Sequence, residues 1–112
     1  MATSKEFADF VSEQVTNFGS VRSRKMFGEY MVYINNKPVL LLCDNTVFVK
    51  MLPEIEGYMK NAEKGYPYDG AKERYILDIE NTELLQSVLP VLIEKQMLPA
   101  KRKKKLKEAQ NV

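Results

Sequence analysis

A chain of 112 residues with 45% hydrophobic residues has the length and composition of one folded domain, which argues against an intrinsically disordered protein. It contains no histidine and one cysteine, which excludes histidine-dependent catalytic sites, zinc sites built with histidine and paired-cysteine motifs. The 17 Lys and Arg residues and 15 Asp and Glu residues give a net charge of +2, which conceals an uneven distribution along the chain.

The basic residues gather at the C-terminal end. Residues 100–112 hold six basic residues against one acidic residue, a charge of +5, which leaves residues 1–99 with 11 basic and 14 acidic residues, a charge of −3. We therefore expect one domain over residues 1–99 and a basic, flexible tail over residues 100–112. The core of this tail is Lys101, Arg102, Lys103, Lys104 and Lys105. Such a run either contacts nucleic-acid phosphates or serves as a solubilising or protein-docking tail, and both interpretations stay open.

The hydropathy pattern bears on location. The longest apolar run, residues 39–43, falls far short of the ~20 residues that a membrane helix needs. The first 18 residues carry Glu6, Asp9 and Glu13, so they do not match a secretory signal. A single cysteine cannot form an internal disulfide, which suits a reducing compartment. We expect a cytoplasmic protein without a membrane partner.

The N-terminal residues predict a helix. Thr3 is expected as its N-cap, with Glu6 completing a capping box, and Gly19 is expected to end it. Apolar residues recur at helical spacing along its length. They are Phe7, Phe10, Val11, Val15 and Phe18.

Three runs rich in β-branched and aromatic residues follow, over residues 24–34, 39–43 and 46–51. Asn35-Asn36-Lys37 and Asp44-Asn45 separate them as tight turns, since asparagine tolerates the left-handed conformation. The pattern predicts a three-stranded antiparallel meander, in which Gly28 indicates a bulge or a close backbone approach.

The remaining residues predict a helix from Pro53 to just before Gly65, a strand over residues 74–79, and a long helix capped by Asn81. Pro90 should kink or split that last helix. The order helix-β-β-β-helix-β-helix predicts the α+β class, with an antiparallel sheet and helices packed on one face. The other face, or an edge, would then be free for a partner.

Several side chains are candidates for chemistry. Arg22, Arg24 and Lys25 could contact an anion or nucleic acid, or could form a solvated strand edge that blocks aggregation. Lys50 and Cys43 lack a visible activating neighbour, so an outward lysine and an apolar filler are the simpler interpretations. The carboxylates of residues 69–80 match no calcium loop. We expect no enzymatic activity, no metal site and no cofactor.

Four tyrosines near basic residues could stack nucleic-acid bases, or could be ordinary core and interface residues. They are Tyr58, Tyr66, Tyr68 and Tyr75.

The run Arg24-Lys25-Met26-Phe27-Gly28-Glu29-Tyr30 resembles the start of the N-terminal domain of the TfoX/Sxy competence-regulator family. The resemblance continues through residues 36–38, 44–50 and 65–68, and through the later strand and leucine-rich helix, so it covers roughly residues 5–105. The positions that match the family motif are Arg24, Met26, Phe27, Gly28, Lys50 and Pro67. We expect their role to be structural.

The resemblance implies an α+β domain shaped like a type III secretion chaperone, with a non-enzymatic role in the bacterial cytosol. Full-length members resemble transcriptional coactivators of DNA-uptake genes that act beside a cyclic-AMP receptor protein. They also carry a second, helical domain, and this chain ends at Val112, so we expect a stand-alone N-terminal domain. The leading hypothesis is a regulatory domain that acts through a protein partner. A direct, nonspecific nucleic-acid-binding module is the alternative, and a homodimer through a sheet edge or face is a further hypothesis.

Overall fold

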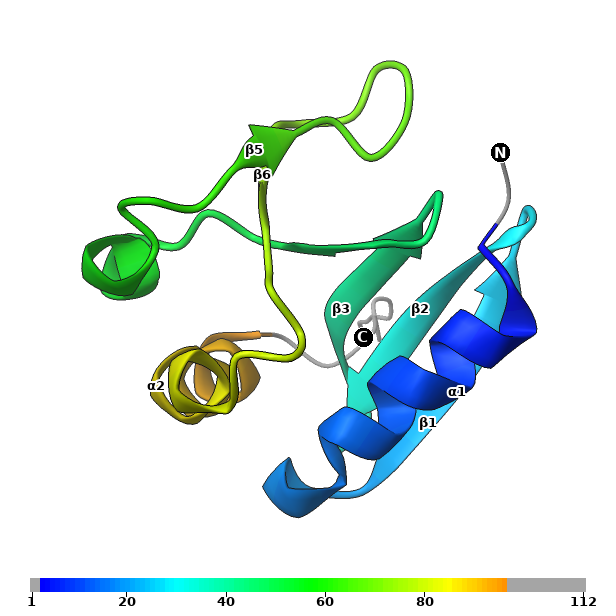
Figure 1. Cartoon of the computed structure of the whole chain (residues 1–112), viewed down its shortest axis with the longest axis horizontal. Coiled ribbons are helices and arrows are strands. Elements are labelled where there is room, and N and C mark those ends of the chain that lie inside the picture. The colour runs from blue at the N-terminus through cyan, green and yellow to red at the C-terminus, as the bar shows by residue number, and fades with distance from the viewer. Residues whose placement is uncertain (1–2, 97–112) are drawn as a thin grey trace, which may run out of the picture.

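Residues 3–96, the part of the chain that the computed structural model describes, form two α-helices and one six-stranded sheet (Figure 1). Every strand pair is antiparallel, and the strand order is β1-β2-β3-β4-β6-β5. The strands are β1 (Val21–Met26), β2 (Glu29–Ile34), β3 (Lys37–Cys43), β4 (Thr46–Val49), β5 (Lys64–Gly65) and β6 (Arg74–Ile76). The helices are α1 (Lys5–Gln14), α2 (Thr82–Lys95) and two short 3₁₀ helices, η1 (Thr16–Phe18) and η2 (Pro53–Tyr58). The predicted α+β class is confirmed.

The predicted single strand over residues 24–34 is wrong. It is a hairpin whose two strands are joined by Phe27 and Gly28, and both residues have positive φ, 53° and 83°. This backbone reverses the chain in two residues and matches the twist of the flanking strands. The expected bulge at Gly28 is therefore a turn, and the meander has four strands in place of three.

The two predicted turns are confirmed. Asn35 and Asn36 have φ of 54° and 67°, and Asp44 and Asn45 have φ of 52° and 53°. Three successive hairpins thus use two-residue left-handed turns, two of them with the residue types that tolerate this conformation best. A register shift between β2 and β3 leaves Val39 as an extra residue, which is a β-bulge next to Pro38.

Both α-helices pack on the same face of the sheet. Alternation along β3 sends Leu40 and Leu42 into the main core, together with Val11 of α1 and Leu89 of α2. α1 contacts β1 and β2, while α2 contacts β3 and η2 (Figure 1). Because the alternate residues of β3 point the other way, the sheet has a second face that the α-helices do not cover.

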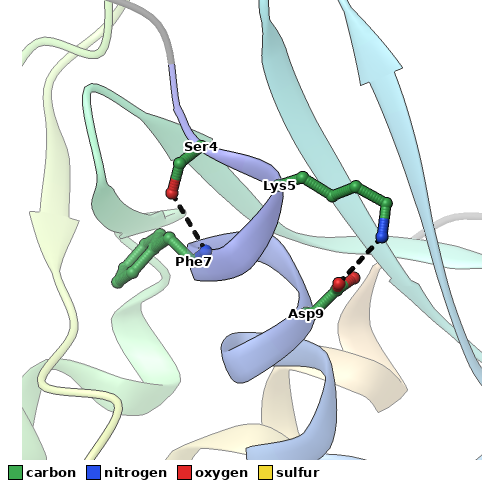
Figure 2. A network of polar contacts seen from close by, with 4 residues as sticks. All are labelled: Ser4, Lys5, Phe7 and Asp9. Atoms are coloured by element: carbon green, nitrogen blue, oxygen red, sulfur yellow. Dashed lines mark hydrogen bonds and ion pairs between the residues drawn. The ribbon is translucent and has the colours of Figure 1, made fainter.

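The start of α1 differs from the sequence prediction. Ser4 is the N-cap, and its hydroxyl accepts a hydrogen bond from the Phe7 backbone N–H at 3.1 Å (Figure 2). Thr3 is 4% exposed and bonds elsewhere, so the expected capping box of Thr3 with Glu6 is wrong. Lys5 and Asp9 form an exposed ion pair at 2.9 Å, which contributes little to stability.

Several later boundaries also shift. The predicted helix after Pro53 is only the six-residue 3₁₀ helix η2, in which Gly57 weakens helix formation. The predicted strand over residues 74–79 ends at Ile76, and β5 was not predicted because two residues carry no periodic pattern. The predicted helix end at Gly19 is late, since α1 ends at Gln14 and Gly19 ends η1.

The last helix confirms its predicted cap. The Asn81 side chain accepts a hydrogen bond from the Leu84 backbone N–H at 3.1 Å. Pro90 does not split the helix, which runs unbroken from Thr82 to Lys95. Pro90 lies on the exposed side, where water can satisfy the carbonyl that loses its partner. No helix within residues 3–96 has the length and apolarity to cross a bilayer.

Replacing Asn81 with alanine should lower the free energy of unfolding by about 1 kcal/mol, because one N–H at the start of α2 loses its acceptor. Urea unfolding followed by circular dichroism measures this difference. Asn81→Asp keeps a side-chain acceptor and should stay close to the wild type. Equal losses in both variants would contradict the capping role.

Candidate functional site

The sheet face opposite the α-helices carries a continuous row of side chains. We call it the open face. Cross-strand partners link Arg24 to Met31, Met31 to Leu41, Leu41 to Phe48 and Phe48 to Ile76, so the row crosses five strands. Leu41, Phe48 and Cys43 form a small buried cluster, separate from the main core, against which Met31 and Ile76 pack. The domain thus has a second apolar layer beneath its open face.

The open face is hollowed at the end where the β1–β2 and β3–β4 turns lie. The hollow has a volume of about 570 Å³. Met31, Leu41 and Cys43 line it from β2 and β3, and Tyr68 and Arg74 line it from the loop and strand that follow β5. Figure 1 shows that the loop between β5 and β6 lies away from both α-helices, on the far side of the molecule. The hollow is therefore built from the meander and this loop.

Phe27 lies at the tip of the β1–β2 hairpin and lines the hollow. Its side chain is 102% exposed, so it gains nothing from burial within residues 3–96. Its φ of 53° is one that a bulky residue rarely adopts, at a cost of roughly 1–2 kcal/mol. Strained backbone of this kind concentrates at binding and catalytic sites. The hairpin tip is thus held in a costly conformation that presents an aromatic ring to solvent.

Three arginines lie on the open face. Arg22 and Arg24 extend from β1, and the Arg22 guanidinium lies 4.0 Å from the centroid of the Tyr33 ring. Arg74 lies at the hollow itself. Within residues 3–96, none of these three arginines forms an ion pair. Their charges are available to an anionic ligand.

Lys25 does not join this group. Strand alternation pairs it with Tyr30 and points it to the other face of the sheet. The predicted trio of Arg22, Arg24 and Lys25 is thus divided, with two members on the open face and one opposite. The alternation was readable from the sequence once the strand was assigned.

Glu29 organises this end of the sheet, and sequence reasoning missed it. Its Oε1 atom accepts hydrogen bonds from the Thr3 backbone N–H at 3.0 Å, the Thr3 hydroxyl at 2.6 Å and the Asp44 backbone N–H at 3.1 Å. The Thr3 backbone N–H also lies 3.2 Å from the Gly28 carbonyl, and the Thr3 hydroxyl accepts from the Asn45 N–H. This carboxylate joins the N-terminus to two turns and fixes the tip that carries Phe27.

Comparison with known families matches residues 13–82 to the TfoX N-terminal domain. This span contains all six strands and every residue of the hollow. The chain belongs to the TfoX N-terminal domain family. It is also 37% identical over 109 residues to an uncharacterized 12.7 kDa protein in the trpE 5′ region of Spirochaeta aurantia, a match that covers 96% of this chain and 95% of that one.

The predicted resemblance is therefore confirmed, and it makes this TfoX N-terminal domain a competence-related regulatory domain. Its relative in Spirochaeta aurantia is of similar length.

The motif residues of this TfoX N-terminal domain divide between two places. Met26 and Phe27 line the hollow, Gly28 completes its turn, and half-buried Pro67 directly precedes Tyr68. Lys50 is exposed and lines a smaller hollow of about 220 Å³, which shares Arg74 with the first. The motif thus gathers around the open face. The other predicted contacts, the basic run from Lys101 to Lys105 and the domain boundary at residue 99, lie outside the described residues.

The four tyrosines also differ in placement. Tyr75 is buried in the main core, whereas Tyr58, Tyr66 and Tyr68 are exposed, and only Tyr68 lines the hollow. A second hollow of about 560 Å³ lies beside η2 and the start of α2, with Lys60, Asn61 and Asp78 among its lining residues. Its lining mixes these polar side chains with Tyr58, Ile76 and Leu84.

The Cys43 thiol should have low reactivity at neutral pH. Burial raises its pKa to about 11, the negative charge of Glu29 adds to the rise, and Arg74 opposes it. The group is therefore a neutral thiol at neutral pH and a poor nucleophile. Within residues 3–96, no three His, Cys, Asp or Glu side chains are grouped so that they could hold a metal ion.

The raised pKa of Cys43 makes a prediction about pH. An unfolded thiol ionises at its ordinary pKa of 9.0, so the stability that the protonated thiol contributes is complete below pH 9 and is lost as the pH rises to about 11. The difference in free energy of unfolding between the wild type and Cys43→Ala should therefore shrink by about 2 kcal/mol between about pH 8 and about pH 10.5. Urea unfolding of both proteins measures it, and a constant difference would contradict the burial of the thiol.

Proposed function

We propose that this TfoX N-terminal domain regulates transcription of DNA-uptake genes by binding a protein partner, without catalysing a reaction. Its family supports a competence-related regulatory role. The proposal rests mainly on Phe27, whose exposed aromatic ring lies on a strained turn beside an apolar hollow. An exposed apolar patch with a polar rim is typical of a protein-interaction surface.

The chemistry of the hollow favours binding over catalysis. Its floor is apolar, its one thiol stays protonated at neutral pH, and the Glu29 Oε1 atom already accepts three hydrogen bonds. A neutral thiol is a poor nucleophile, and a carboxylate oxygen that already accepts three hydrogen bonds is poorly placed to take a proton from a substrate. We therefore propose that the domain acts by binding a partner at the open face.

Deletion of the gene followed by complementation tests this proposal. Transcripts of DNA-uptake genes should fall in the deletion strain and should return with the wild-type gene. Phe27→Asn should fail to restore them although the protein accumulates to the wild-type level, which immunoblotting checks. Unchanged transcripts in the deletion strain would refute the proposed regulation.

The second candidate function is direct nucleic-acid contact through the basic tail and the β1 cations. It is favoured by Arg22 and Arg24, which form no ion pair within residues 3–96. Titration of labelled double-stranded DNA with the full chain and with residues 1–99, at two salt concentrations, tests it. Each phosphate contact should add about −0.9 to the slope of log K against log salt. Binding retained by residues 1–99 would promote this candidate, and loss with the tail would confine DNA contact to residues beyond 99.

A homodimer could form through β1, which within residues 3–96 is an edge strand of the sheet and pairs there with β2. A two-fold antiparallel pairing of two β1 strands centred on Ser23 would place Arg22 of one copy opposite Arg24 of the other, with both side chains on the open face. Like charges at directly opposed positions are unfavourable. A different partner with acidic side chains would meet no such repulsion, so the charge pattern of β1 favours a hetero-partner over a second copy.

A further inference from the structure

We infer that the open face binds an acidic segment of a protein partner, and that one large apolar side chain of this segment enters the hollow beside Phe27. This inference rests on the proposed function, because it names the surface and the chemistry of the partner.

The hollow suits one large apolar side chain. Its volume of about 570 Å³ lies within the range of small-ligand pockets. Met26, Met31, Leu41 and Cys43 contribute its apolar wall, and a polar group placed there would lose its hydrogen bonds to water without replacement. The two methionines are flexible and polarizable, so they can adapt to a side chain that enters.

The rim favours negative charge. Arg74 lines one end of the hollow, and Arg24 stands next to Met31 on the same face. Glu29 also lines the hollow. Its Oε1 atom accepts hydrogen bonds from Thr3 and Asp44, which offset part of its negative charge, and within residues 3–96 it forms no ion pair with either arginine. Guanidinium groups form strong charge-assisted hydrogen bonds with carboxylates. A segment with carboxylates on both sides of its apolar residue could place that residue in the hollow while its carboxylates contact the arginines at the rim.

The same features favour a protein segment over a nucleic acid. Residues 1–99 carry a net charge of −3, so a long polyanion is repelled by most of the domain, whereas a few carboxylates can be confined to the neighbourhood of Arg24 and Arg74. Bases stack on flat aromatic platforms. Met26, Met31, Leu41 and Cys43 line the hollow with aliphatic and sulfur-bearing side chains, which suit an inserted side chain. The rings of Phe27, Tyr30 and Tyr68 also line it, so the oligonucleotide is the necessary competitor in the test.

Fluorescence anisotropy with three labelled probes tests the inference. The probes are a short peptide with one phenylalanine between runs of aspartate, the same peptide with lysine in place of each aspartate, and a single-stranded oligonucleotide of mixed sequence. Residues 1–99 and the full chain are titrated in parallel, so that the basic tail is separated from the open face. We expect the aspartate peptide to bind both proteins more tightly than either other probe. No binding of the aspartate peptide by residues 1–99, or tighter binding of the lysine peptide or the oligonucleotide, would overturn the inference.

Neighbouring residues of β1 supply a matched pair of variants. Arg24 lies on the open face and Lys25 on the opposite one, although both are exposed and carry one positive charge. Arg24→Gln should lower the affinity for the aspartate peptide roughly threefold to tenfold, while Lys25→Gln should leave this affinity nearly unchanged. Equal losses would mean nonspecific charge attraction and would overturn the site.

The experiment also separates this inference from the proposed function. A regulatory partner that binds Phe27→Asn and Arg24→Gln as tightly as the wild type would overturn the site and leave the proposed function in place. Unchanged transcripts after gene deletion would refute the function, whatever the peptide does.

Discussion

Phe27→Asn is expected to raise the melting temperature of this TfoX N-terminal domain by a few degrees while it weakens partner binding at least tenfold. Asparagine adopts the left-handed backbone at φ 53° with little strain. The substitution should therefore raise the free energy of unfolding by about 1 kcal/mol. For a domain of this length, 1 kcal/mol corresponds to about 4 °C. The lost ring is fully exposed, so its removal opens no cavity. Thermal unfolding and anisotropy with the aspartate peptide measure the two effects.

The next hairpin offers the converse control. Asn36 occupies the second position of its turn at φ 67° and is exposed. Asn36→Phe should lower the melting temperature by a similar amount, because it places a bulky residue in the same backbone region. It should leave peptide affinity unchanged. If Phe27→Asn lowered the melting temperature, the claim that stability is sacrificed for an exposed ring at this turn would be wrong.

Glu29→Ala is expected to lower the free energy of unfolding by about 3 kcal/mol. The carboxylate accepts three hydrogen bonds. Its loss leaves the Thr3 hydroxyl and the Asp44 N–H without this acceptor, while the Thr3 backbone N–H keeps only the Gly28 carbonyl. Release of Thr3 to solvent would limit the penalty, which is why the sum of three full hydrogen bonds is not expected. Urea unfolding measures the change.

Glu29→Gln is the matched variant, since it keeps the shape and one acceptor oxygen but removes the charge. It should lower the free energy of unfolding by about 1 kcal/mol, less than the alanine variant does. Equal stability of Glu29→Ala and the wild type would show that the N-terminus and the two turns hold together without this carboxylate.

The sequence predicted the parts of the fold that rest on local chemistry. The turns at Asn35-Asn36 and Asp44-Asn45 were readable because these residue types favour positive φ, and Asn81 was readable because it precedes an apolar helical stripe. The turn at Phe27-Gly28 was missed because phenylalanine is unfavourable there. The departure from local preference coincides with the candidate binding site, as expected where function opposes stability.

The site itself was only partly readable. The motif and the basic residues of β1 were singled out. The hollow, however, also depends on Tyr68 of the β5–β6 loop and Arg74 of β6, which lie 19 and 25 residues beyond the end of β4. The bond between Thr3 and Glu29 spans 26 residues and has no local signal. Long-range contacts of this kind follow from packing, whereas the opposite facing of Arg24 and Lys25 follows from alternation alone.

Amide NMR titration of the full chain with the aspartate peptide would test most directly whether the open face is the binding site. We expect chemical-shift changes that centre on residues 26–31, 41–43 and 68–74, with small changes in α1 and α2. The same titration of Phe27→Asn should show these changes only at much higher peptide concentration. Shift changes confined to the basic run near residue 101, or to the helix-covered face, would contradict the open face as the binding site.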